Sequence, residues 1–285
     1  MHRTGNHGLT CRDAYHLAME LEGRHVVVTG AANGIGRALA TRFHAEGAKV
    51  VASDRDEDSL AAVVERLNQA RPDSAVPITV DIGTEAGNQH LVAAAEDAFG
   101  PIDLFFANAG VAVGTDLTTP EAEWELAFNV NVHAHRWAAK YLLPGWLARG
   151  EGYFCSTASA AGLLSQIGSA PYSLTKHGAV AFAEWISITY GDQGVRASCL
   201  CPQGVNTNML NGGPITSSGA GNVVRASGVV LEPDDVAEVA VGVIRAETFL
   251  ILPHPEVLTY LQRKSGDYDR WLAGMRKLQA RIVGG

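Results

Sequence analysis

Tyr172 and Lys176 are two side chains whose types and spacing suit acid–base chemistry. Residues four apart share one face of a helix, so the Lys176 ammonium can lie close to the Tyr172 phenol. A phenol with a reference pKa of about 10 is a poor base near neutral pH, and a neighbouring cation lowers that pKa by favouring the phenolate. Ser159 lies thirteen residues before Tyr172, at the end of an expected strand, where its hydroxyl can polarise a substrate oxygen. Taken alone, Tyr172 and Lys176 could instead be a surface pair on an amphipathic helix.

A glycine-rich segment that joins an expected strand to an expected helix has the composition of a phosphate-binding turn. Residues 29–36 read Thr-Gly-Ala-Ala-Asn-Gly-Ile-Gly and directly follow the apolar run 26–28. Glycines let the backbone approach a pyrophosphate, and the helix N-terminus supplies oriented N–H groups and the positive end of the helix dipole. The residues expected to contact a dinucleotide here are Gly30, Asn33, Gly34, Ile35 and Gly36.

Asp54 predicts which dinucleotide binds. It ends the second expected strand, 24 residues after Gly30, where an acidic residue bonds the ribose hydroxyls of adenosine. A carboxylate at this place repels a 2′-phosphate, which favours NAD over NADP. Arg55 is evidence for the alternative, NADP, because its guanidinium could pair with that phosphate.

The elements that position these groups alternate along the chain from His25 to Leu252. Pro77 places one of the expected strands at the edge of the sheet, because proline cannot donate to a central ladder. Helix-length segments separate the strands, and repeated βαβ units form a parallel sheet covered on both faces. The predicted fold is therefore α/β, a three-layer, doubly wound, parallel seven-stranded sheet in one domain. The strands are expected at 26–28, 49–53, 75–80, 104–106, 153–157, 196–200 and 249–252.

From Leu21 to about Leu252 the motifs together resemble the short-chain dehydrogenase/reductase family, whose fold is a Rossmann fold. The glycine turn matches that family's Thr-Gly-x-x-x-Gly-x-Gly pattern in full. The resemblance implies further cofactor contacts, at the adenine, after the fourth strand, and beside the nicotinamide. In that order they are Asp81 and Ile82, then Asn108, Ala109 and Gly110, then Pro202, Val205 and Thr207, with Tyr172 and Lys176 also touching the cofactor.

The resemblance also implies a catalytic tetrad of Asn131, Ser159, Tyr172 and Lys176. Asn131 would kink its helix and hold a water that leads to Lys176, and Asn129 is the alternative candidate. Gln203 departs from the family pattern, which usually has a glycine directly after the proline that follows the sixth strand. This departure leaves the local backbone shape open, although not the cofactor.

The chain is accordingly predicted to be an NAD(H)-dependent oxidoreductase that interconverts a secondary alcohol and a ketone. Tyr172 is the expected general acid/base, Lys176 lowers its pKa and binds the nicotinamide ribose, and Ser159 bonds the reacting oxygen. The alternatives are a non-catalytic redox sensor that binds the dinucleotide, and a lyase or epimerase of the same fold. Family resemblance further implies a homotetramer, with the helices that carry Trp137 and Phe182 at subunit interfaces.

Composition excludes several classes of partner. The 285 residues hold 22 basic and 30 acidic side chains, a net charge of −8, without a Lys/Arg cluster, so neither a nucleic acid nor a membrane is an expected partner. The first 20 residues lack the apolar stretch of a signal peptide, which predicts a cytoplasmic protein. His133 and His135 lie two apart and cannot share a helix face, so no metal site is expected.

Two segments lie outside the family pattern. The expected catalytic domain, 21–254, stands between an N-terminal extension, 1–20, and a C-terminal extension, 255–285, and it includes a glycine-rich and serine-rich stretch at 207–228 that is expected to act as a lid. Apolar residues with helical spacing predict an amphipathic helix over 268–282 that docks on the substrate side, against this lid or a neighbouring subunit's lid. The alternative is packing on the chain's own outer helices without functional consequence. The apolar residues are Trp271, Met275, Leu278 and Ile282.

Overall fold

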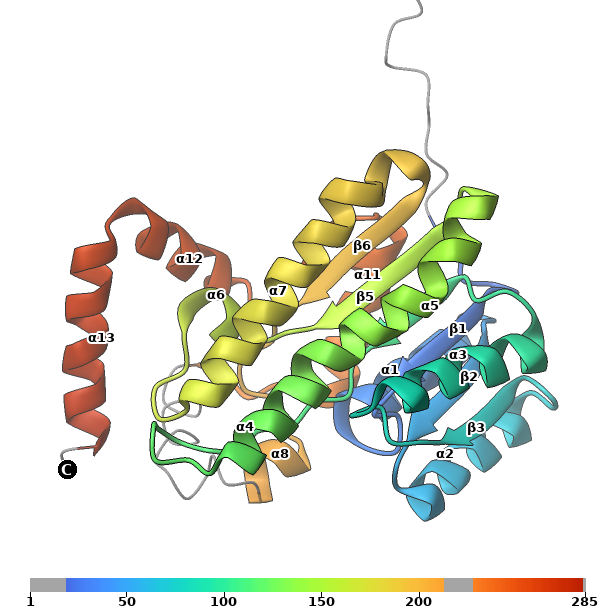
Figure 1. The fold of residues 1–285 in the computed structure, drawn as a ribbon, viewed down its shortest axis with the longest axis horizontal. Coiled ribbons are helices and arrows are strands. Elements are labelled where there is room, and N and C mark those ends of the chain that lie inside the picture. The colour runs from blue at the N-terminus through green and yellow to red at the C-terminus, as the bar shows by residue number, and fades with distance from the viewer. Residues whose placement is uncertain (1–18, 213–227, 284–285) are drawn as a thin grey trace, which may run out of the picture.

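The computed structural model, which describes residues 19–212 and 228–283, contains a seven-stranded parallel sheet (Figure 1). The strand order is β3-β2-β1-β4-β5-β6-β7, so the predicted doubly wound sheet is confirmed and the strand that carries Pro77 lies at an edge, as predicted. Most of the N-terminal extension, 1–18, lies outside the described residues. The strands are β1 (His25–Thr29), β2 (Lys49–Asp54), β3 (Ala75–Thr79), β4 (Leu104–Ala107), β5 (Gly152–Thr157), β6 (Val195–Leu200) and β7 (Leu250–Ile251).

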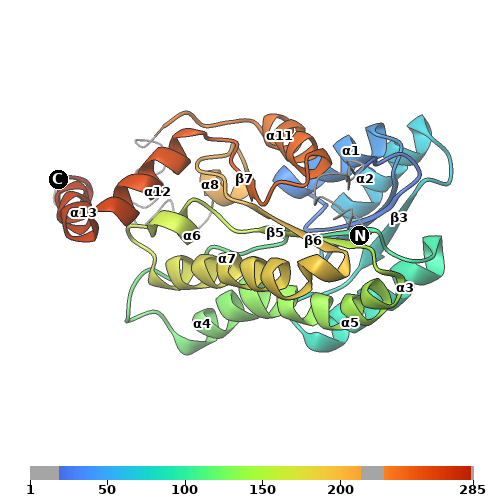
Figure 2. The ribbon, with the colours of Figure 1, turned by 90° about the horizontal axis from the view of Figure 1, so that it is seen from above.

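Helices cover both faces of the sheet (Figure 2). One face carries α1 (Gly34–Ala45), α2 (Glu57–Ala70) and α11 (Pro233–Arg245). The opposite face carries α3 (Glu85–Phe99), α4 (Glu121–Phe128), α5 (Ala134–Arg149) and α7 (Ala170–Tyr190). Between α4 and α5 lies a π-helical segment, η1 (Asn129–His133). Two short helices, α6 (Ala161–Leu164) and α8 (Asn208–Gly212), follow β5 and β6, and η2 (Gly191–Gln193) is a 3₁₀ turn before β6.

The five central strands, β2, β1, β4, β5 and β6, are buried on both faces, which explains their nearly continuous apolar sequence. Successive side chains of a strand point to opposite faces, so Val26 and Val28 pack with α1 and α11, while Val27 packs with Phe105 and α3. Helix α1 ends where predicted, because Gly47 adopts a positive φ of 90° directly after the capping residue.

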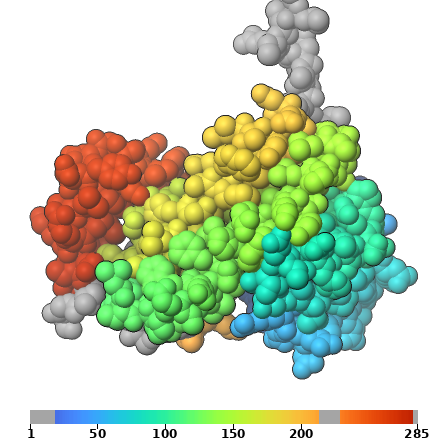
Figure 3. Space-filling model, in the orientation of Figure 1, coloured from blue at the N-terminus to red at the C-terminus, as the bar shows by residue number. Residues whose placement is uncertain are grey.

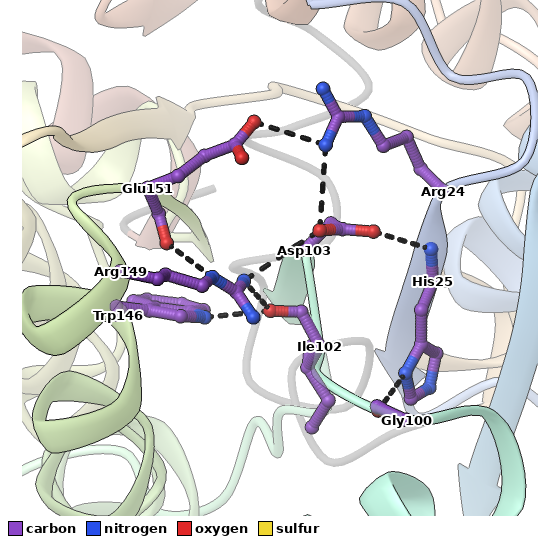
Figure 4. Close-up of polar contacts among 8 residues, drawn as sticks. All are labelled: Arg24, His25, Gly100, Ile102, Asp103, Trp146, Arg149 and Glu151. Atoms are coloured by element: carbon purple, nitrogen blue, oxygen red, sulfur yellow. Dashed lines mark hydrogen bonds and ion pairs between the residues drawn. The ribbon is translucent and has the colours of Figure 1, made fainter.

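A polar network fixes the amino ends of β1 and β4 (Figure 4). The carboxylate of Asp103 accepts a hydrogen bond from the His25 N–H at 2.9 Å and forms ion pairs with Arg24 at 3.5 Å and Arg149 at 3.6 Å. The indole N–H of Trp146 donates to the Ile102 carbonyl at 2.7 Å. The network therefore holds the sheet at its amino end, and the carboxyl end is left for the cleft described below.

After β7 the chain forms two helices, α12 (Glu256–Gly266) and α13 (Tyr268–Val283). Helix α13 agrees with the helix predicted over 268–282. Helix α12 was not predicted, although Val257, Leu261 and the buried Lys264 have helical spacing. In the parts of the chain that the structure describes, no helix has the length and apolar composition needed to cross a membrane.

Candidate active site

A cleft of about 970 Å³ lies at the carboxyl end of the sheet and extends from the glycine turn to Tyr172. Every residue predicted to contact the cofactor lines it, and so does Ser159. The structure thus brings together Gly30, Asn33, Gly34, Ile35, Gly36, Asp54, Asp81, Ile82, Asn108, Ala109, Gly110, Tyr172, Lys176, Pro202, Val205 and Thr207. Of the predicted tetrad, only Asn131 lies behind the cleft wall, where it is fully buried.

The glycine turn fits the pyrophosphate of a dinucleotide. A Cβ atom on Gly36 would lie 2.0 Å from the Gly30 carbonyl oxygen, and one on Gly30, whose φ is +68°, would lie 2.9 Å from Ala109 Cα. Side chains at these two positions would clash with the backbone, because the turn, the helix and the sheet lie very close together there. Helix α1 begins at this turn with no side-chain hydrogen bond at its N-cap, Asn33, and no acidic residue in its first turn. Its N–H groups and the positive end of its dipole therefore suit an anion.

Asp54 lies at the carboxyl end of β2 with its carboxylate held beside the glycine turn. One oxygen accepts a hydrogen bond from the Ala32 N–H at 3.1 Å, and the other accepts from the N–H groups of Arg55 at 2.7 Å and Asp56 at 3.1 Å. The side chain of Arg55 is exposed and also lines the cleft. A ribose at this place would therefore meet a fixed carboxylate.

Asn108 links three strands beneath the cleft. Its Nδ2 donates to the Thr29 carbonyl at 2.9 Å, and its Oδ1 accepts from the Thr157 hydroxyl at 3.1 Å. The N–H groups of Asn108 and Ala109 donate to the Thr29 hydroxyl at 2.9 and 3.0 Å. These bonds fix the ends of β1, β4 and β5 in the positions that the cleft floor requires.

Lys176 is buried, with 2% of its surface exposed, and its Nζ donates to the Thr157 carbonyl at 2.9 Å. The Nζ lies 5.7 Å from the centre of the Tyr172 ring. Burial lowers the pKa of Lys176 to about 8. A Cβ atom on Gly110 would lie 3.2 Å from this Nζ, so the absence of a side chain there leaves the ammonium accessible from the cleft.

The pKa of Tyr172 does not follow the predicted direction. Burial raises the pKa of the phenol, and a hydrogen bond with Ser159 opposes this rise. The Lys176 ammonium, which bonds to the Thr157 carbonyl and lies 5.7 Å from the ring centre, does not outweigh this effect of burial on the pKa. In the protein alone, the tyrosine is therefore held in its protonated form.

Asn131 lies in the π-helical segment η1, so the predicted interruption of this helix is present. Its Oδ1 accepts from the Val111 N–H at 2.8 Å, and its Nδ2 donates to the Val111 carbonyl at 2.9 Å and to the Thr175 hydroxyl at 3.0 Å. Asn131 thus connects the segment that follows β4 to Thr175, the residue before Lys176. Asn129, the alternative candidate, lines the cleft, and within the described parts of the chain its side chain makes no hydrogen bond with α7.

Ser159 and the loop after β6 hold each other in place. The Ser159 hydroxyl donates to the Pro202 carbonyl at 3.4 Å and accepts from the Ala161 N–H at 3.1 Å. The N–H of Gln203 donates to Nδ1 of His254 at 3.2 Å, and Nε2 of His254 donates to the Val229 carbonyl at 3.1 Å. These bonds of His254 hold the backbone at Gln203, the residue that replaces the glycine of the family pattern. His254 was not predicted from the sequence.

Other residues that line the cleft come from α8, α12 and α13. Trp271, Met275 and Leu278 lie on the substrate side, as the predicted amphipathic helix requires, and Tyr260 and Arg263 of α12 were not predicted. Helix α8 contributes the first part of the predicted lid, while 213–227 and the side chain of Ile282 lie outside the described residues.

His135, Cys199 and Cys201 lie outside the cleft and have structural partners. The Nδ1 of His135 hydrogen-bonds with the Ser156 hydroxyl at 3.0 Å, and Cys199 and Cys201 are buried with their sulfur atoms 3.8 Å apart. Across 19–212 and 228–283 no cluster of His, Cys, Asp and Glu could hold a metal ion.

This chain is similar to known proteins over most of its length. The chain is 33% identical over 222 residues to the meso-2,3-butanediol dehydrogenase of Serratia marcescens, an alignment that covers 78% of this chain and 87% of the relative. It is 32% identical over 259 residues to the 1-deoxy-11-beta-hydroxypentalenate dehydrogenase of Streptomyces avermitilis, which covers 90% and 93% of the two chains. A short chain dehydrogenase/reductase from Burkholderia phymatum, solved in complex with NAD, superposes with a TM-score of 0.81 at 31% identity and covers 88% of this chain and 96% of its own.

The family profile described as short chain dehydrogenase matches residues 24–214, which span the glycine turn, Ser159, Tyr172 and Lys176. The relatives are named as dehydrogenases, which act on alcohol groups. From fold, cleft and relatives together, this chain belongs to the short-chain dehydrogenase/reductase family of oxidoreductases.

Proposed function

We propose that this protein is an NAD(H)-dependent oxidoreductase that interconverts a secondary alcohol and the matching ketone. The observation that carries the proposal is the placement of Tyr172, Lys176 and Ser159 at one end of the cleft whose other end is the glycine turn. Bound there, NAD supplies the hydride acceptor that no side chain can provide. In the oxidation direction, the alcohol carbon gives up a hydride, its hydroxyl gives up a proton, and a ketone and NADH result.

The side chains have separate roles in this proposal. As the phenolate, Tyr172 takes the hydroxyl proton during oxidation, and as the phenol it returns one during reduction. Ser159 donates a hydrogen bond to the reacting oxygen and so fixes it beside the phenol. The ammonium of Lys176, held by Thr157, bonds the ribose next to the nicotinamide and supplies positive charge near Tyr172. Asn131 is a positioning residue, because it acts through Thr175 on the helix that carries Tyr172 and Lys176.

NAD is the preferred cofactor in this proposal, because the Asp54 carboxylate stands where a 2′-phosphate would have to lie. The prediction is that Asp54→Asn raises the ratio of kcat/KM for NADP to that for NAD by at least about tenfold, since like charges in contact cost several kcal/mol. Arg55→Gln is the matched variant, and it should lower the same ratio. A wild-type enzyme that prefers NADP would contradict the role of Asp54.

Two other functions of the same fold would give different results in an assay with NAD(H) and substrate. A redox sensor would bind NADH without turnover, and a lyase or epimerase would convert its substrate without a net change in NADH. The presence of both Tyr172 and Lys176 favours the dehydrogenase over the sensor.

The deciding experiment follows NADH absorbance while the purified protein is given NAD and a panel of secondary alcohols, with ketone quantified by chromatography. The proposal expects NADH and ketone in equal amounts from at least one alcohol. NADH binding without turnover of any alcohol, or substrate conversion without NADH, would contradict it.

The assembly proposed is a homotetramer. Helix α7 supports it with two large apolar side chains that the single chain leaves exposed, Trp185 at 48% and Ile188 at 84%. The proposal also includes a small-molecule substrate and a cytoplasmic location, as the sequence predicts.

A further inference from the structure

The substrate half of the cleft is walled by helices that lie beyond the family match at 24–214. Helices α12 and α13 form a lobe beside α6 and α7 in the space-filling view (Figure 3). They contribute five side chains to the cleft wall. One is cationic, Arg263, and four are apolar or aromatic, namely Tyr260, Trp271, Met275 and Leu278. This wall is apolar except for a single charge.

The wall has a fixed position relative to the reacting groups. Val257 of α12 is fully buried and packs in the same cluster as Leu163 and Leu164 of α6. Lys264, with 9% of its surface exposed, donates from Nζ to the Leu163 carbonyl at 2.6 Å. Because α6 begins two residues after Ser159, this bond ties α12 to the segment that holds the catalytic serine.

The side chain of Arg263 lines the cleft, whereas that of its neighbour Lys264 bonds to α6. Arg263 lies three residues after Tyr260, so the two share a helix face, and the guanidinium carbon lies 6.0 Å from the centre of the Tyr260 ring. Both line the cleft. Among the described residues, no carboxylate forms an ion pair with Arg263. The other charged residues of the described lining lie on β2, β3, α4 or α7, or directly after them, and are Asp54, Arg55, Asp81, Glu125 and Lys176.

We propose that the substrate is a bulky, apolar secondary alcohol that carries an oxyanion such as a carboxylate, and that Arg263 binds this anion. The proposal rests on the proposed function, whose reacting end lies at Tyr172. A guanidinium presents its N–H donors in a fork that matches a carboxylate. The Arg263 side chain is exposed as well as lining the cleft, so a bound anion can reach it without moving the helix. The apolar body of the substrate would lie against Trp271, Met275 and Leu278.

The test compares two alcohols that differ only in the anion, 4-phenylbutan-2-ol and 4-(3-hydroxybutyl)benzoate. The readout is the ratio of kcat/KM for the carboxylated alcohol to that for the neutral one, in wild type, Arg263→Gln and Arg263→Lys. We expect wild type to favour the carboxylate, and Arg263→Gln to lower the ratio about fivefold, the upper end of the range for an exposed ion pair. Arg263→Lys should retain part of the preference. Arg270→Gln, exposed and outside the cleft lining, is the control and should match wild type.

An equal ratio in wild type and Arg263→Gln would overturn the role of Arg263 while leaving the dehydrogenase intact. If wild type oxidises neither alcohol, calorimetry on the NADH-saturated protein still decides the inference. Wild type should then bind 4-phenylbutyrate more tightly than 4-phenylbutyramide, and Arg263→Gln should lose that difference. Equal affinity of wild type for the two compounds would contradict an anion site, whatever reaction the protein catalyses.

Discussion

At the scale of one residue, buried His135 limits the pH range in which the folded protein is stable. Its Nδ1 hydrogen-bonds with Ser156, and burial, with a smaller effect of the Lys176 charge, lowers the pKa of the imidazole to about 3. The unfolded chain has the ordinary pKa of 6.5, so below that pH the unfolded state binds a proton that the folded state does not. Stability must therefore fall as the pH falls from about 6.5 towards 3.

The predicted contribution of His135 is a loss of about 1.4 kcal/mol of unfolding free energy per pH unit in that window. Urea unfolding of wild type and His135→Gln at a series of pH values measures it. The free energy of unfolding of the variant should depend less steeply on pH, by the equivalent of one bound proton. His90→Gln, at an exposed position on α3, is the control. Parallel pH profiles for His135→Gln and wild type would contradict the assignment.

Some residues of the site could be predicted from sequence and others could not. The glycine turn, Asp54, Ser159, Tyr172 and Lys176 belong to local motifs of fixed spacing, and all of them line the cleft. Arg263 lines the cleft only because α12 packs on α6, and His254 bonds to Gln203 only because the segment after β7 lies beside the loop after β6. No local pattern encodes either contact. The pKa of Tyr172 was predicted in the wrong direction for the same reason, since burial and the place of the Lys176 Nζ are tertiary properties.

At the scale of elements, apolar periodicity predicted most of the fold. The seven strands are short runs of branched and aromatic residues, and Pro77 identified the edge strand. Helix α12 was missed because its inward positions include Lys264, a charged residue that periodicity counts as exposed. The π-helical segment was anticipated only through the family resemblance, because its stretch Asn-Val-Asn-Val-His has the same apolar spacing in an α-helix.

Helix α13 gives the prediction that belongs to this scale. Its apolar face lines the cleft, so removing residues 267–285 should raise KM for 4-phenylbutan-2-ol about tenfold, a loss of about 1.4 kcal/mol of binding. KM for the smaller butan-2-ol, which does not reach α13, should change little. Steady-state kinetics on the truncated chain checks this, with Arg276→Gln on the exposed side as control. Equal KM changes for both alcohols would indicate that α13 is only a structural addition.

At the scale of the whole molecule, the exposed side of α7 is the feature that a single chain does not explain. Large apolar side chains exposed together on a helix mark a surface that another protein surface covers. Trp185 and Ile188 would be covered in a tetramer by the same helix of a second copy, an isologous contact.

Light scattering tests the assembly directly. Wild type should scatter with four times the 30.1 kDa mass of the chain, and Ile188→Glu should lower that mass by placing charges in the contact. Arg66→Glu on the exposed side of α2 should leave the tetramer intact. A wild-type monomer at micromolar concentration would contradict the proposed tetramer.

The central claim is that Tyr172 transfers the proton during alcohol oxidation, and replacing its hydroxyl tests that claim most directly. Tyr172→Phe should lower kcat by about 10²–10⁴-fold, the usual contribution of a general acid or base, while NADH still binds with the wild-type dissociation constant. Tyr190→Phe, at the far end of the same helix, is the matched control and should keep full activity. If Tyr172→Phe bound NADH normally and turned over alcohol at the wild-type rate, the proposed mechanism would be wrong.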